Sequence, residues 1–227
     1  MSMMQDGKAF EREALGVADL EKEKALINPY LREMLRGQMY RGYSEEAVRR
    51  LHAAHPEEKA VFDKKLEGAV VTEFKDNHHS QVLDKEKAFM IIRQAQPRER
   101  EPLADDLYNT IAIELGLEEM DENEDYMDLK FYTAVDSKLD GIFGVDAFFI
   151  YNYTNPETKQ LEEIRITVDV TTNPAKVASN SELILHFHSE DSESRSKWKE
   201  PVAQYGKEIA DKIKQKIVQI ENNKIKK

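Results

Sequence analysis

Two aspartates each stand alone in a stretch of sequence that otherwise predicts a buried β-strand. Asp146 lies in Gly-Val-Asp-Ala-Phe-Phe-Ile, and Asp169 lies in Ile-Thr-Val-Asp-Val-Thr-Thr-Asn-Pro. A carboxylate is costly to bury unless something compensates it, and a metal ion is a common compensator. Two such strands side by side would place both carboxylates at one divalent cation, which activates water and neutralises charge on a phosphate. The pair therefore indicates metal-dependent chemistry on a phosphodiester.

The strands that carry these aspartates predict how they meet. Residues 145–153 are apolar on both faces apart from Asp146, which is typical of a central strand. Residues 161–171 alternate, with isoleucines and valines on one face and Asp169 on the polar face. Because the turn between the strands is short, we expect an antiparallel hairpin that brings both carboxylates to one end of the sheet.

Other side chains can complete this site. Glu114 lies three residues after Ile111 in the predicted helix 103–116, so we expect it to face the apolar stripe and to act as a third metal ligand. Asp140 is a further acidic candidate, on a predicted loop that enters the central strand. Lys176, seven residues after Asp169, can stabilise charge on a phosphate, and Lys138 is an alternative.

With these residues, the chain resembles the PD-(D/E)XK nuclease superfamily over about residues 103–190. The resemblance implies an α/β fold: a restriction-endonuclease-like mixed β-sheet core flanked by helices. It also implies that Asp146 and Asp169 are the two motif acids and that Glu114 is the acid on the preceding helix. The implied cofactor is Mg²⁺ or Mn²⁺, and the implied substrate is nucleic acid, DNA rather than RNA.

The chain departs from the family pattern at one position. The family places a lysine two residues after its second acid, where this chain has Thr171. Lys176 can take that place. If it does not, the chain is an inactive relative that binds nucleic acid or a protein. A third interpretation is an unrelated α+β module whose acids are incidental.

The chain divides into two regions. Residues 1–96 predict a mostly helical region that contacts substrate or a protein partner, with one helix beginning at Pro29. The polar segment Gln96–Pro102 carries two prolines and predicts a boundary. Residues 103–227 predict the nuclease-like α/β core, which ends in a long helix over residues 197–222.

Composition excludes several classes of function. The chain has 227 residues and no cysteine, which excludes disulfides, thiolate zinc sites and cysteine nucleophiles. The net charge of −11 argues against a protein that coats nucleic acid nonspecifically. The sequence shows neither a signal peptide nor a membrane helix, so we expect a cytoplasmic protein.

Two weaker patterns have ordinary structural explanations. His186 and His188 lie on one face of a predicted strand and can bind zinc, but no third histidine is close in sequence. Basic and aromatic residues alternate from Arg36 to Tyr43, as on a nucleic-acid-binding surface, although a normal helix edge gives the same pattern.

Overall fold

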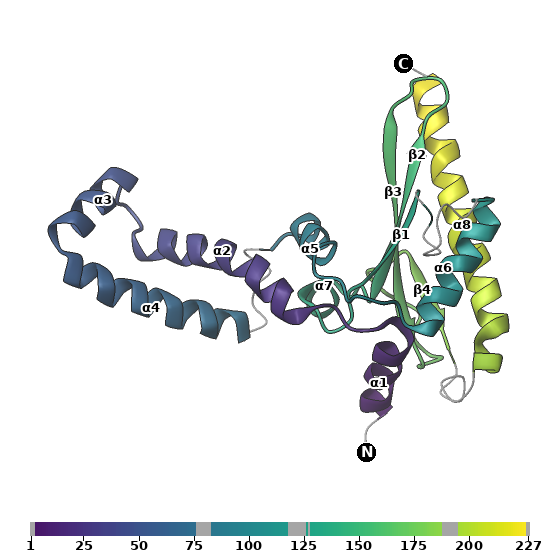
Figure 1. Ribbon diagram of the computed structural model, residues 1–227, viewed down its shortest axis with the longest axis horizontal. Helices are drawn as coiled ribbons and strands as arrows, with labels where there is room; N and C mark the ends of the chain where they lie inside the picture. The colour runs from purple at the N-terminus through teal and green to yellow at the C-terminus, as the bar shows by residue number, and fades with distance from the viewer. Residues whose placement is uncertain (1–2, 76–82, 118–125, 127, 188–194, 226–227) are drawn as a thin grey trace. The chain divides into compact units, whose positions relative to one another are not determined.

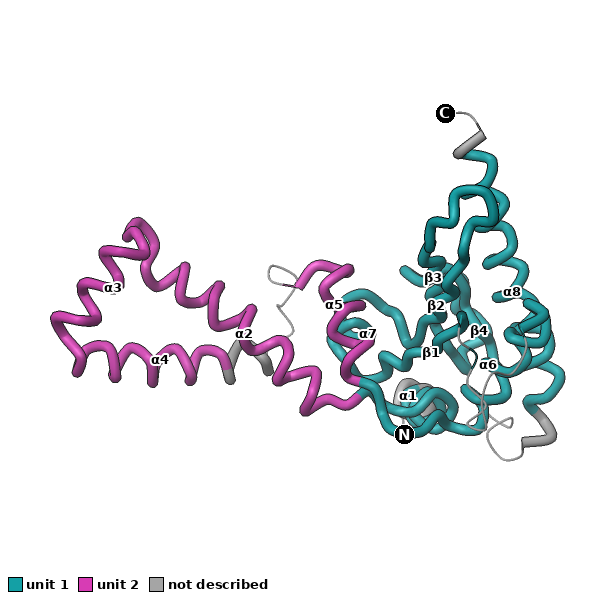
Figure 2. The backbone as a smooth tube through the Cα atoms, turned by 45° about the horizontal axis from the view of Figure 1, so that its top comes forward, with its two compact units in different colours: residues 1–18, 96–227 teal, residues 19–95 magenta. Residues whose placement is uncertain are grey.

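The computed structural model describes residues 3–75, 83–117, 126, 128–187 and 195–225. These residues form two compact units, shown in Figure 2. Unit 1 contains residues 1–18 and 96–227, and unit 2 contains residues 19–95. The first helix therefore belongs with the core, whereas the sequence pattern grouped it with the helical region.

Unit 1 is built on a four-stranded mixed sheet in the order β1-β2-β3-β4. The strands are β1 (Leu129–Thr133), β2 (Ala147–Thr154), β3 (Leu161–Thr171) and β4 (Leu183–His186). The pairs β1–β2 and β2–β3 are antiparallel, and β4 runs parallel to β3. The antiparallel hairpin and the central position of β2 are therefore confirmed.

Two helices cover one face of this sheet (Figure 1). They are α6 (Pro102–Leu115) and α8 (Arg195–Ile225). Alternation along β3 sends its apolar residues into the core between the sheet and these helices. The buried residues of β3 in this core are Ile164, Ile166, Val168 and Val170. Helix α6 ends at Gly116, which adopts the left-handed conformation (φ 70°) that glycine tolerates best.

The first helix, α1 (Met3–Leu15), is attached to unit 1 by its apolar face and by the chain that follows it. Phe10, Ala14 and Leu15 are buried in the sheet core. After α1, the Thr133 hydroxyl donates to the Gly16 carbonyl at 2.9 Å. These contacts fix α1 at the end of the sheet where β2 begins.

Unit 2 is made of helices. They are α2 (Leu20–Met39), α3 (Glu45–Ala54), α4 (Pro56–Lys75) and α5 (Lys85–Ile92). The side chains of Asp19, Ser44 and Asp84 cap α2, α3 and α5 by accepting hydrogen bonds from the first turn. The prediction that a helix begins at Pro29 is wrong, because α2 begins nine residues earlier and contains Pro29.

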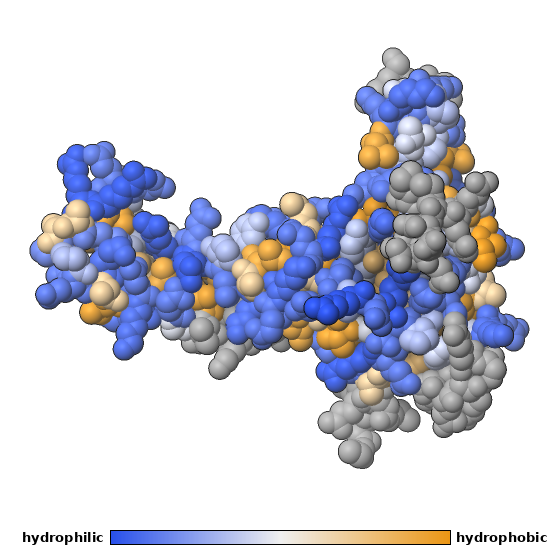
Figure 3. All heavy atoms as spheres, in the orientation of Figure 1, coloured by the Kyte–Doolittle hydropathy of each residue, from blue (hydrophilic) through white to orange (hydrophobic). Residues whose placement is uncertain are grey.

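The fold class is a mixed α/β arrangement with a helical N-terminal half, a four-stranded mixed sheet and a C-terminal helix. One short helix, α7 (Lys138–Phe143), lies where the sequence predicted a loop. The sequence also contains an acidic run over residues 118–128 and the pair His78-His79. Residues 118–125 and 127 and both histidines lie outside the described residues. Within the described ranges, every helix is too short or too polar to cross a bilayer. Hydrophilic residues cover most of the face in Figure 3, with scattered hydrophobic spots.

Close packing of α6 against α8 depends on Gly206. A Cβ atom at this position would overlap the side chain of Thr110, whose hydroxyl is hydrogen-bonded to the Asp106 carbonyl. We expect Gly206→Ala to destabilise the protein by about 1–3 kcal/mol, because the two helices must move apart. Urea unfolding measures this change. Gly68→Ala in α4 is the control, since its Cβ would meet open space. Equal stability of the Gly206→Ala variant and the unchanged protein would contradict this packing.

Candidate metal site

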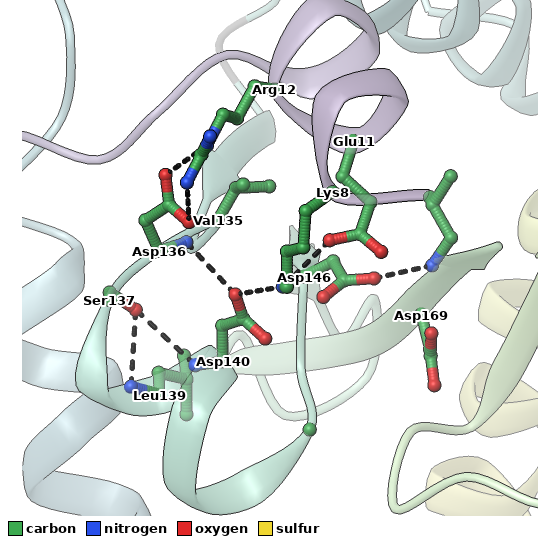
Figure 4. Close-up of polar contacts among 12 residues, drawn as sticks. Lys8, Glu11, Arg12, Val135, Asp136, Ser137, Leu139, Asp140, Asp146 and Asp169 are labelled. Atoms are coloured by element: carbon green, nitrogen blue, oxygen red, sulfur yellow. Dashed lines mark hydrogen bonds and ion pairs between the residues drawn. The ribbon is translucent and has the colours of Figure 1, made fainter. Parts of the chain in front are cut away.

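Asp146 lies directly before β2, and Asp169 lies in β3 next to the residue that pairs with the start of β2. Ala147 pairs with Val168, and one step further the Asp146 N–H donates to the Val168 carbonyl at 3.1 Å. Among the described residues, the acids that lie close enough together to share one cation include Asp146 but not Asp169. Both aspartates are buried, each with 4% of its surface exposed. The sequence-predicted pair therefore lies at one end of the sheet, with Asp146 just before β2 and Asp169 in β3 (Figure 4).

Asp146 is held by the strand beside it. Its Oδ2 accepts a hydrogen bond of 2.7 Å from the Val170 N–H of β3. This bond favours the charged carboxylate, but burial acts more strongly in the opposite direction. Burial, followed by the negative charge of Glu11, raises the pKa of Asp146 to about 8. Without a cation, the protein therefore keeps this carboxyl protonated over much of the neutral range.

The short helix α7 positions Asp140. The Ser137 hydroxyl caps this helix by accepting from the Leu139 and Asp140 N–H groups. The Asp140 Oδ2 atom accepts from the Asp136 N–H at 2.9 Å, which fixes the side chain over the first turn. Asp136 itself adopts a left-handed conformation (φ 65°), which aspartate tolerates better than most residues. Helix α7 therefore fixes the position of the Asp140 carboxylate through contacts among residues 136–140.

The third acid of the cluster comes from α1. Carboxylate oxygens of Glu11, Asp140 and Asp146 all lie within 4.8 Å of one another, as Figure 4 illustrates. We call these three residues the acidic cluster. Glu11 is 9% exposed, and burial raises its pKa, with an opposing effect from Lys8. Its Oε2 atom is buried and forms an ion pair with Lys8 Nζ at 2.7 Å.

Two lysines accompany these acids. Lys8 Nζ lies 2.6 Å from the Asp140 Oδ2 atom, so a second residue of α1 reaches the site. Burial would lower the pKa of Lys8, but its bonds to Asp140 and Glu11 outweigh burial and raise it. Lys176 Nζ lies 2.6 Å from the Asp169 Oδ1 atom. Lys176 follows a turn in which the Asn173 side chain accepts from the Ala175 N–H, and this turn returns the chain to Asp169.

The charges of this site do not balance. The acidic cluster and Asp169 supply four carboxyl groups, and Lys8 and Lys176 supply two ammonium groups. With every group ionised, two negative charges remain at a largely buried place, where they repel one another strongly. The raised pKa of Asp146 is one means of relief, and a divalent cation is another.

The other sequence candidates lie elsewhere or have different contacts. Glu114 is exposed near the end of α6, so the expectation that it faces the buried stripe is wrong. It is not in the acidic cluster; the acid that a helix contributes there is Glu11. The Thr171 hydroxyl accepts from the Asn173 N–H and shapes the turn before Lys176. Lys138 begins α7.

Sequence reasoning missed Glu11 and Lys8. The only local signal was the apolar spacing of Phe10, Ala14 and Leu15, which predicts a buried helix face next to Glu11. That signal does not say which part of the chain the helix packs against. For the proposed histidine pair, His186 ends β4 and bonds through its backbone to the Tyr205 hydroxyl, and His188 lies outside the described residues.

Comparison of the chain with protein-family models, with curated proteins and with solved structures gave no match.

Burial of Asp146 gives a pH dependence with a definite sign. Its pKa of about 8 in the folded protein lies above the unfolded value of 3.8, so folding favours the protonated form. The metal-free protein should lose stability as pH rises between these values, by up to about 1.4 kcal/mol per pH unit from this group. Asp146→Asn should reduce this slope and should be the more stable protein at pH 8. Urea unfolding in EDTA at pH 5–9 measures both effects.

The control for this experiment is Glu114→Gln, which removes an exposed carboxylate of the same unit. We expect it to leave the slope of stability against pH unchanged. If Asp146→Asn gave the same slope as the unchanged protein, the inferred titration of Asp146 would be refuted.

Proposed function

We propose that this protein hydrolyses a phosphodiester bond of nucleic acid, DNA rather than RNA, with Mg²⁺ or Mn²⁺. The observation that carries the proposal is the buried excess of acid: four carboxyl groups against two lysines, with three of the carboxylates within 4.8 Å. Proteins rarely bury such an excess unless a cation compensates it. A divalent cation has the charge that would balance it.

The donor set fits these two metals. All candidate ligand atoms are carboxylate oxygens, which Mg²⁺ and Mn²⁺ prefer over the nitrogen and sulfur ligands typical of zinc. The buried Glu11 Oε2 atom, which forms an ion pair with Lys8 Nζ, would bind the cation in addition to or in place of this pair. We expect Asp146, Glu11 and Asp140 to hold the metal, with Asp169 beside them on β3.

The residues of the site would have different roles in the reaction. When bound, the metal supplies an activated water and neutralises negative charge on the phosphate. Lys176, released from Asp169, would contact a phosphate oxygen and stabilise the charge that develops there. Lys8 would stay with Asp140 and keep Glu11 and Asp140 from repelling each other. Asp146 would lose its proton as it takes up the metal.

The sheet is compatible with the resemblance noted from the sequence. A helix, an antiparallel meander that carries the acids, and a fourth strand parallel to the third follow one another along unit 1. One difference is the connection between β3 and β4, residues 172–182, which has no helix. The other difference is Glu11, which would replace Glu114 as the acid that a helix supplies.

A non-catalytic role is the second candidate. Two observations favour it: Thr171 stands where the family has lysine, and both lysines of the site are already paired with acids. In such a protein these ion pairs would stabilise the fold, and the same unit would bind nucleic acid or a protein without cleaving it. Titration with Mn²⁺ separates the two roles: a catalytic site should bind the metal saturably, and a non-catalytic one should not.

The central test combines metal binding with cleavage. Calorimetric titration with Mn²⁺ should show one saturable site, and a labelled DNA strand should be cut only when the metal is present. Asp146→Asn and Asp169→Asn should reduce cleavage at least about 100-fold, because each removes a charge next to the metal. Glu114→Gln should bind and cleave normally, since Glu114 is exposed and not in the cluster. No saturable heat and no cleavage would refute the catalytic proposal.

Lys176 has a test of its own. Lys176→Met should lower the cleavage rate about 100-fold with little change in Mn²⁺ affinity, because it removes a phosphate contact and no metal ligand. Lys176→Arg should recover part of the rate, since it restores the positive charge. Full activity in Lys176→Met would exclude Lys176 from the reaction.

A further inference from the structure

Unit 2 contains an open groove of about 950 Å³. Helices α2, α3 and α4 form it together with the turn between α2 and α3. Two of its glycines, Gly37 and Gly42, have open space where a Cβ atom would be. Gly42 also adopts a positive φ of 93°, which lets the chain turn tightly between Tyr40 and Tyr43.

The groove contains a cluster of aromatic rings. The ring of Tyr40 lies 4.5 Å from that of Phe62 and 5.4 Å from that of His52, measured between ring centres. The Tyr40 hydroxyl and His52 Nε2 are hydrogen-bonded, which fixes the orientation of both rings. Tyr43, at the end of the turn, also lines the groove and is 66% exposed. The groove thus offers both fixed rings and an exposed ring.

Basic side chains line the same groove, and they differ in their contacts. Arg32 forms an ion pair with Glu67, and Lys59 forms one with Asp63. Arg36 and Arg41 form no ion pair with any residue that the structure describes. Of the groove's acids, Glu45 pairs with Arg49. Glu33 is the remaining acid in the lining, so the unpaired groups carry a small excess of positive charge.

We propose that this groove binds a single strand of nucleic acid, with bases stacked on Tyr43 and Tyr40 and phosphates held by Arg36 and Arg41. Every base has a flat π-face, so aromatic rings beside arginines bind single strands of any sequence. The choice of nucleic acid rests on the proposed function of unit 1. The groove itself shares no residue with the acidic site.

A duplex fits these features less well. Its bases are stacked on one another inside the helix, so the rings of the groove could not reach their faces. An apolar helix of a protein partner is the main competing occupant. The arginines without ion pairs favour a strand of phosphates, because an apolar helix would leave their charges uncompensated.

The test is fluorescence anisotropy of a labelled 20-nucleotide DNA strand with the full-length chain in EDTA, where metal-dependent cleavage cannot occur. We expect saturable binding that weakens between 50 and 200 mM salt. The double variant Arg36→Glu/Arg41→Glu should bind at least about tenfold more weakly. Tyr43→Ala should weaken binding about fivefold or more through lost stacking. A duplex of the same sequence should bind more weakly than the single strand.

The matched control is Lys64→Glu/Lys65→Glu, which makes the same change in charge at two exposed residues of α4 that do not line the groove. It should bind the strand within about twofold of the unchanged protein, and circular dichroism should show equal helix content in both double variants. Three results would overturn the proposal: no binding of the strand, equal loss in both double variants, or tighter binding of the duplex.

The outcomes separate this inference from the proposed function. Glu114→Gln should bind the strand as tightly as the unchanged protein, since Glu114 lies in unit 1 outside the acidic cluster. Binding at the groove without any cleavage would count against the nuclease proposal and leave this inference standing. Cleavage with unaltered binding in the groove variants would refute the inference alone.

Discussion

The site of unit 1 is governed by the cost of burying like charges together. The carboxyl groups of Glu11, Asp140 and Asp146 meet next to the start of β2, and Asp169 lies near the end of β3. Asp146 and Asp169 are almost fully removed from water. Several neighbouring features reduce this cost. Lys8 and Lys176 form ion pairs with acids of the site, a backbone N–H donates to Asp146, and protonation of Asp146 removes one negative charge. A structural core alone does not require this arrangement, because apolar residues would fill the same space at lower cost.

Helix α1 connects this site to the rest of unit 1. Its apolar side packs on the sheet core through Phe10, Ala14 and Leu15, and its polar side supplies Glu11 and Lys8. Lys8 and Asp140 are 132 residues apart in sequence, so their contact forms only when the unit has folded. The same helix thus completes the core and the acidic cluster, and the affinity of the cluster for a cation should depend on how firmly α1 is docked.

The two units differ in charge, which matters for an anionic substrate. Residues 19–95 contain 14 lysines or arginines and 14 aspartates or glutamates, so unit 2 is neutral. The net charge of −11 therefore lies entirely in unit 1. Unit 1 would repel a strand of nucleic acid, and a divalent cation in its acidic site would reduce that repulsion locally. A neutral unit with a basic and aromatic groove offers such a strand a second place of contact that needs no metal.

The sequence by itself determined the local elements and the two aspartates. Alternation along residues 161–171, the apolar run around Asp146 and the short turn between them predicted the antiparallel hairpin and the central strand. The helix predicted over residues 103–116 likewise agrees closely with α6. These features depend on neighbours within a few residues, so a single sequence contains them. The prediction that a helix begins at Pro29 was wrong because the local sequence does not distinguish a proline at the start of a helix from one inside it.

Only the tertiary structure decided which acids and bases join the two aspartates. Glu114 has the helical spacing of a ligand but is exposed, whereas Glu11, on a helix more than a hundred residues away, lies in the cluster. The turn at Asn173 brings Lys176 back to Asp169, and helix α7 positions Asp140. Such contacts between residues distant in sequence depend on how the helices and strands pack, and periodicity along the sequence does not encode that packing.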